Sequence, residues 1–267
     1  MIFMIPTLAA FLVAFAIPFI MGLYLSFCNF KTIGNAKWVG LSNYAFVFKD
    51  STGFIAALGF TAKVAIVGVL STNVLSFALA LLLTKGLKGT NVYRTIFFLP
   101  NLIGGIILGY IWQLLLNGIL INLVQGDLTM KASYGYWGII ILYNWQKIGY
   151  LMIIYIAGIQ AISADLYEAA NIDGANYWQT LKSIIIPLVM PSVTVCSFLS
   201  LTDCFKMYDQ NLALTGGAPA NQTAMLALDI SNTYYNRVGF AGVGQAKAVV
   251  FTILVFENEL IQLNVSS

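Results

Sequence analysis

Histidine is absent from this 267-residue chain, and charged residues make up only 9% of it. Without histidine there are no imidazole metal ligands, no histidine general base and no histidine-containing catalytic triad. A soluble domain carries about 25% charged residues, because its surface must be hydrated. Since 60% of the residues are hydrophobic, a soluble fold of this length has too little polar surface to cover its apolar side chains. The solvent around most of the chain is therefore predicted to be lipid.

Cysteine and net charge are also scarce. The cysteines at positions 28, 196 and 204 form no C-x-x-C pair, and we interpret them as small apolar residues, with a disulfide or redox role as the minor alternative. The net charge of +3 is small and scattered, which argues against a nucleic-acid partner. The glycine pairs Gly104-Gly105 and Gly216-Gly217 do not open the Gly-Lys-Ser/Thr pattern of a phosphate loop. We therefore expect this chain itself to bind no ATP and no other cofactor or metal.

Apolar stretches recur along the chain. A membrane-spanning helix needs about 20 mostly apolar residues. The sequence predicts an all-α polytopic membrane protein with about six such helices, in a single transmembrane domain over residues 1–267. The predicted spans are residues 1–30, 64–84, 95–116, 136–162, 183–202 and about 239–263. The first span is predicted to be retained, because it lacks the basic n-region of a signal peptide and is too long for an h-region.

The charges between the spans favour one orientation. Six spans place both termini on the same side of the membrane as the second and fourth loops. The second loop contains Lys85, Lys88 and Arg94 and no acidic residue, so the positive-inside rule predicts that these loops lie in the cytoplasm. Three lysines in the first loop, on the opposite side, weaken this assignment.

The fourth loop, residues 163–186, is too polar for lipid and has the pattern of two short helices. Asp165 is suited to cap the first helix, and Glu168 three residues later would complete a capping box. Gly174 is a natural breaker at its end, and a second amphipathic segment follows until Pro187 interrupts it. A helix–turn–helix with small residues on one face lets another surface approach closely. On the residues alone, docking and simple helix capping explain Glu168 and Gly174 equally well.

The same loop resembles a known family. Glu168-Ala169-Ala170, three residues, Gly174, nine residues and Ile184-Ile185-Ile186-Pro187 match the signature E-A-A-x3-G-x9-I-x-L-P of permease subunits of binding-protein-dependent ABC importers. Only Ile186 departs from it, where leucine is usual. The run from Tyr167 to Gln179 resembles the carbohydrate branch, specifically the maltose/glycerol-3-phosphate-type first permease subunit. Segments 39–44 and 214–219 resemble external loops of that branch, although Ala218 stands where glycine is commoner.

The resemblance implies a type I ABC importer permease in the plasma membrane of a bacterium or archaeon, a transporter subunit and not an enzyme. It would translocate a sugar or oligosaccharide. Its implied partners are a second homologous permease subunit, two ATPase subunits that would bind ATP and Mg, and an extracytoplasmic sugar-binding protein. The cytoplasmic coupling loop would dock on the ATPase through Glu168, Ala169, Ala170, Asp173 and Gly174. The external loop would face the binding protein through Thr215, Gly216, Gly217 and Pro219.

Polar residues in and beside the spans leave alternatives open. Lys147 is either a functional intramembrane charge or a residue that extends to the outer interface, and we favour the second interpretation. Asp203, Lys206 and Asp209 either line the outer mouth of a pathway or are simply solvated. Amides within the spans could bind a polyol, but more often bond neighbouring helices; they are Asn73, Asn101, Gln113 and Asn144.

A self-sufficient secondary transporter of small polar solutes is the alternative function. Such carriers commonly have acids at the membrane midplane and inverted repeats, and this sequence shows neither. An intramembrane enzyme is a weaker interpretation of the sequence, because there is no nucleophile motif and no cluster of acids in adjacent spans. Glu257 and Glu259 fall at the end of the sixth predicted span, where carboxylates are costly unless they pair or reach the interface.

Overall fold

The computed structural model describes residues 4–49, 53–86 and 88–266, and most of them lie in helices. The side chains of residues 33 and 257–266 are not part of this description, so the predictions for Glu257 and Glu259 lie outside it. The all-α prediction is confirmed, because the sheet in these described ranges is only a short antiparallel pair of β1 (Cys28–Asn29) and β2 (Lys37–Trp38). In lipid, helices satisfy every backbone hydrogen-bonding group internally, which is why the apolar stretches adopt them.

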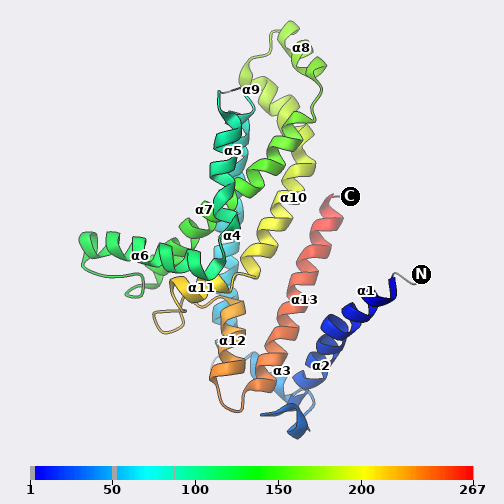
Figure 1. Cartoon of the computed structure of the whole chain (residues 1–267), viewed down its shortest axis with the longest axis vertical. Coiled ribbons are helices and arrows are strands. Elements are labelled where there is room, and N and C mark those ends of the chain that lie inside the picture. Colours follow the sequence, from blue (N-terminus) through cyan, green and yellow to red (C-terminus); the bar gives the residue numbers. More distant parts are fainter. Residues whose placement is uncertain (1–3, 50–52, 87, 267) are drawn as a thin grey trace.

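Three long helices form the centre of the molecule. These are α4 (Phe54–Leu83), α7 (Ala132–Gln160) and α10 (Ile186–Phe205), and each contacts the other two. Helix α5 (Thr90–Phe98) packs along α7. Figure 1 shows these helices running along the long axis of the molecule. Buried side chains of α7, including Tyr143, Leu151 and Tyr155, fill the space between them.

The C-terminal helix packs beside this centre, and part of the N-terminal helix packs on the C-terminal helix. The N-terminal helix consists of α1 (Met4–Phe11), a π-helical turn η1 (Leu12–Ala16) and α2 (Ile17–Ser26). The C-terminal helix α13 (Ala241–Ser266) contacts α2 and two short helices, α3 (Ser42–Val47) and α12 (Leu226–Asn236). The short η2 (Ile33–Asn35) lies in the first loop. Figure 1 shows α3 and α12 at one end of the molecule and α8 (Ala164–Ile172) at the other.

Proline does not end the membrane helices where the sequence predicted an interruption. Helix α9 (Tyr177–Thr180) continues through a π-helical turn, η5 (Leu181–Ile185), into α10, which contains Pro187 and Pro191. The prediction that Pro187 interrupts the helix is therefore wrong. A wider π turn just before the proline accommodates the missing N–H and the bulky ring. The same arrangement occurs in the first helix, where η1 precedes Pro18.

The third predicted span, residues 95–116, is also wrong as a single helix. Helix α5 ends at Phe98, a 3-10 turn η4 (Leu99–Leu102) follows, and α6 (Gly105–Val124) begins after an extended residue. Figure 1 shows α6 lying across the long axis. Pro100 lacks an N–H and glycines 104 and 105 favour a bend, so the backbone breaks here. Hydropathy cannot detect this break, because the residues around it are apolar.

The other predicted spans correspond to helices. Among the described residues, five helical segments are long and apolar enough to cross a membrane, and a shorter apolar helix covers residues 241–256. The five are Met4–Ser26, Phe54–Leu83, Gly105–Val124, Ala132–Gln160 and Tyr177–Phe205. Helix α4 begins well before the predicted start at residue 64 and contains Lys63. Lys63 is exposed, and a lysine can carry its charge away from apolar surroundings along its own aliphatic chain, so this isolated charge does not end the helix.

Candidate functional site

The loop of residues 163–186 folds into α8 and α9, as predicted, but a different residue caps α8. The side chain of Ser163 accepts a hydrogen bond from the backbone N–H of Asp165, so Asp165 lies in the first turn and is not the cap. Within the described contacts, the carboxylate of Glu168 makes no hydrogen bond to the start of its helix. The capping-box prediction is therefore wrong, and Glu168 projects from an exposed helix face.

Gly174 ends α8 in the predicted way. Its φ of +74° lies in the left-handed region that favours glycine. The N–H of Ala175 donates to the carbonyl of Ala170 at 2.9 Å, and the N–H of Gly174 donates to Asn171 at 3.2 Å. This is the paired bonding of a Schellman motif. Helix α9 then starts with a reciprocal capping box between Asn176 and Gln179.

The surface of this loop carries large exposed apolar side chains. Ile172 is 86% exposed and Trp178 is 73% exposed, on either side of Gly174. Glu168, Ala169, Asp173 and Gly174 are exposed as well, whereas Ala170 is buried. Small residues line a cavity of about 410 Å³ at the turn, including Ala169, Ala170 and Gly174. A protruding tryptophan and isoleucine beside a small-residue hollow have the shape and composition of a protein-docking surface.

A second cavity, of about 590 Å³, lies between this loop and the ends of α4 and α7. Its lining includes Lys85, Tyr167 and Tyr177. The ammonium of Lys85 lies 4.4 Å from the ring centroid of Tyr177, which joins the second and fourth loops by a cation–π contact. Burial raises the pKa of Tyr167, so its phenol remains a neutral hydrogen-bonding group.

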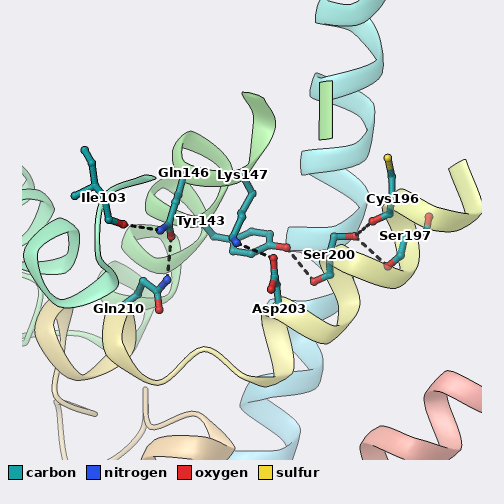
Figure 2. A network of polar contacts seen from close by, with 9 residues as sticks. All are labelled: Ile103, Tyr143, Gln146, Lys147, Cys196, Ser197, Ser200, Asp203 and Gln210. Atoms are coloured by element: carbon teal, nitrogen blue, oxygen red, sulfur yellow. Dashed lines mark hydrogen bonds and ion pairs between the residues drawn. The ribbon is translucent and has the colours of Figure 1, made fainter. Parts of the chain in front are cut away.

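A network of polar side chains crosses the helix bundle (Figure 2). The ammonium of Lys147 in α7 lies 2.8 Å from the carboxylate of Asp203 in α10. Lys147 therefore has a partner in the protein. Asp203 lies near the end of α10, and the position of Lys147 at the outer interface stays a prediction. One turn earlier, Tyr143 donates to the carbonyl of Ser200 at 2.9 Å. Gln210 of α11 (Asp209–Leu214) donates to the side chain of Gln146 at 2.9 Å.

The intramembrane amides mostly bond neighbouring helices, as expected. Asn73 of α4 donates to Ser200 at 3.0 Å and accepts from Tyr155 at 2.7 Å. Asn144 accepts from Thr72 at 2.8 Å, and Gln113 donates to the carbonyl of Leu214 at 3.1 Å. Asn73 and Asn144 thus join the central helices α4, α7 and α10, and Gln113 joins α6 to α11. These contacts hold the central helices in register.

Removal of one partner of the Lys147–Asp203 pair is expected to have a modest effect. The side chains are 19% and 38% exposed, so water screens a charge that loses its partner. Lys147→Met should destabilise the protein by about 1 kcal/mol, measured as a lower melting temperature in detergent. Exchange of the charges, Lys147→Asp with Asp203→Lys, should restore part of the loss. Lys63→Met, on an exposed lysine of α4, is the control; equal effects of both lysine variants would contradict a stabilising pair.

The loop of residues 215–225, which contains the predicted external residues, is organised by one buried amide. The side chain of Asn211 donates to the carbonyl of Thr223 and to the hydroxyl of Thr215, and it accepts from the N–H of Met225. Gly216 and Gly217 have φ values of +56° and +87°, and Pro219 follows a cis peptide bond. The four predicted residues therefore lie in one internally bonded loop, which is located toward the end of the molecule that is remote from α8 (Figure 1).

A second ion pair was missed by the sequence interpretation. The ammonium of Lys247 in α13 donates to Asp229 of α12 at 2.6 Å and to Thr233 at 2.9 Å. The side chain of Lys247 is 0% exposed and that of Asp229 is 12% exposed. The ring of Phe54, at the start of α4, lies 6.0 Å from the ammonium. Lys247 falls inside the sixth predicted span, so the general rule that an intramembrane charge needs a partner would have identified it.

Long apolar helices, joined to one another by hydrogen bonds between polar side chains, are typical of a multi-pass membrane protein. Residues 73–265 match the family described as binding-protein-dependent transport system inner membrane component. The chain belongs to this family. It is thus an inner-membrane permease subunit and not an enzyme.

Known proteins are similar to this chain along nearly its whole length. The chain is 40% identical to a probable starch degradation products transport system permease protein, AmyD of Thermoanaerobacterium thermosulfurigenes, covering 98% of this chain and 91% of that protein. It is 31% identical to the trehalose/maltose transport system permease protein MalF of Thermococcus litoralis, with coverage of 98% and 91%. A bacterial ABC transporter involved in the import of the acidic polysaccharide alginate has the same fold, with a TM-score of 0.81, 22% identity and coverage of 98% and 94%.

Proposed function

We propose that this chain is the transmembrane permease subunit of an ATP-driven importer and translocates a sugar or oligosaccharide delivered by an external binding protein. The observation that carries the proposal is the exposed loop of residues 163–186 at one end of an apolar bundle. Family membership and the saccharide transport named for the relatives support it. The alternative, a self-sufficient secondary transporter, does not agree with this family.

The proposed assembly contains a second permease subunit, two ATPase subunits and a sugar-binding protein. ATP and Mg would bind to the ATPase subunits. The chain would form one membrane domain over residues 1–267, with its cytoplasmic coupling loop at residues 163–186. Within that loop, Ile172 and Trp178 would anchor the ATPase beside Glu168, Asp173 and Gly174, because large exposed apolar side chains dominate such interfaces. The loop with Thr215, Gly216, Gly217 and Pro219 would face the binding protein.

Purification of the tagged chain from native membranes in mild detergent tests this proposal. An ATPase and a second permease should be recovered with it, and a sugar-binding protein should bind the purified assembly. Trp178→Ala should lower the recovered ATPase by at least about tenfold, since loss of a tryptophan anchor typically costs about 2 kcal/mol or more. Trp137→Ala, on an exposed tryptophan of α7, is the matched control. A lone chain that transports saccharide in proteoliposomes would overturn the proposal.

A further inference from the structure

A polar pocket of about 410 Å³ lies beside the loop of residues 215–225, which places it away from α8. This volume is within the range of small-molecule sites. Its lining combines three amides, a carboxylate and a guanidinium with only small residues between them: Gly216, Asn221, Ala224, Asp229, Asn232, Asn236 and Arg237. The coupling loop of residues 163–186 contributes no residue to this pocket.

The walls of the pocket are held in place by buried contacts. Asp229 is fixed by the fully buried Lys247. The buried side chain of Asn211 stabilises the loop through hydrogen bonds to the backbone of Thr223 and Met225. Asn221 adopts a φ of +61°, an uncommon conformation for a residue with a side chain. Strained residues of this kind persist where the surrounding structure determines them, and they cluster at ligand-binding sites.

The chemistry of the lining selects among ligand classes. Carboxamides both donate and accept hydrogen bonds, Arg237 only donates, and the ionised carboxylate of Asp229 only accepts. Asn236 donates to the carboxamide oxygen of Asn232 at 3.0 Å, which orients both groups. An apolar ligand would leave these groups unpaired. The lining carries one carboxylate and one guanidinium, whose charges are opposite, so it does not select for an ion. A neutral molecule with several hydroxyl groups, each a donor and an acceptor, satisfies all of these groups.

We propose that this pocket is an external saccharide subsite of the permease, formed mainly by Asn221, Asn232, Asn236 and Asp229. The inference rests on the proposed function for its orientation and for its ligand class. The pocket would take up hydroxyl groups of a sugar before it enters the helix bundle, either from a free sugar or from a sugar leaving the binding protein.

A cysteine-protection experiment tests the subsite. The native cysteines at positions 28, 196 and 204 are buried, so an engineered exposed cysteine dominates labelling. Ala220→Cys introduces a thiol beside Asn221 without removing a lining side chain, and Ser42→Cys places one on α3 at the same end of the molecule. Both are treated with a membrane-impermeant maleimide, from the outside of cells expressing the complete transporter, with or without maltotriose or trehalose.

Maltotriose or trehalose is expected to slow labelling of Ala220→Cys about fivefold at a concentration about four times the dissociation constant, and to leave Ser42→Cys unchanged. Adding Asn232→Ala should abolish the protection, whereas Asn122→Ala, on an exposed amide of α6, should not. A comparison of protection by free sugar with protection by the sugar-loaded binding protein shows which of the two delivers sugar to the pocket.

Outside labelling of both cysteines without protection by either sugar would overturn the subsite and leave the permease assignment intact. Protection by the unliganded binding protein, with none from sugar, would also overturn it and identify a protein-docking surface. Labelling of both cysteines only from the cytoplasmic side would contradict the orientation, and hence the proposed function itself.

Discussion

Replacement of Gly174 by valine is expected to reduce saccharide uptake by at least about tenfold while the permease remains folded. Gly174 has a φ of +74°, and a β-carbon there would meet no atom of this chain within 4 Å. The cost to folding is therefore only the backbone strain, about 1–2 kcal/mol. The β-branched side chain would instead project toward whatever docks on the turn. Uptake of radiolabelled sugar, ATPase activity of the assembly and the melting temperature measure the three effects separately.

Gly86 provides a matched control for this experiment. It also has a φ of +74° and no atom within 4 Å of a built β-carbon, and it lies in the second loop, which contacts the fourth through Lys85 and Tyr177. Gly86→Val should carry a similar strain and retain coupled uptake. Normal uptake by Gly174→Val would refute the docking role of the turn. An equal loss in both variants would assign the effect to backbone strain.

Lys247→Met is expected to be the most destabilising single substitution considered for this chain. It leaves the carboxylate of Asp229 largely buried without the ammonium that lies 2.6 Å away. Loss of one partner of a buried pair costs about 3–5 kcal/mol, because the remaining charge is not solvated. The melting temperature in detergent should fall by about 10 °C. Thermal unfolding followed by size-exclusion chromatography measures this change.

Removal of both charges distinguishes pairing from packing. Lys247→Met combined with Asp229→Asn should recover much of the lost stability, since no unpaired charge remains. Lys147→Met, in the more exposed pair, is the matched comparison and should cost several times less. A Lys247→Met protein that melts at the wild-type temperature would show that the pair contributes nothing to stability.

The sequence predicted helical segments well where the length and apolar composition of a stretch are enough to identify a membrane helix. The stretches around residues 4–26, 132–160 and 177–205 are apolar for longer than a bilayer requires, and lipid permits only internally bonded backbone there. Gly174 was also predictable, because a helix end in the left-handed region strongly favours glycine. Its link to a docking loop came from the resemblance of the E-A-A-x3-G pattern to a family signature, and the docking role stays a prediction.

Contacts between distant segments were not predictable in this way. The break at Leu99–Gly104 lies within an uncharged run, and its proline and glycine resemble those that other helices tolerate. Lys147 was noticed, but its partner Asp203 lies 56 positions later in the chain, and only packing of α7 on α10 brings them together. The identity of the cap of α8 depended on a choice between Ser163 and Asp165, which are both good capping residues.

Composition and local pattern by themselves determined that this chain is a helical membrane protein with a polar helix–turn–helix loop, because the transfer free energy of a side chain and the conformation of a glycine are local properties. The tertiary structure decided which charges are paired, where α6 turns away from the bundle, and how Asn221, Asp229 and Asn236 come to line one pocket. Those outcomes depend on distances between residues far apart in the chain, and such distances are set only when the helices pack.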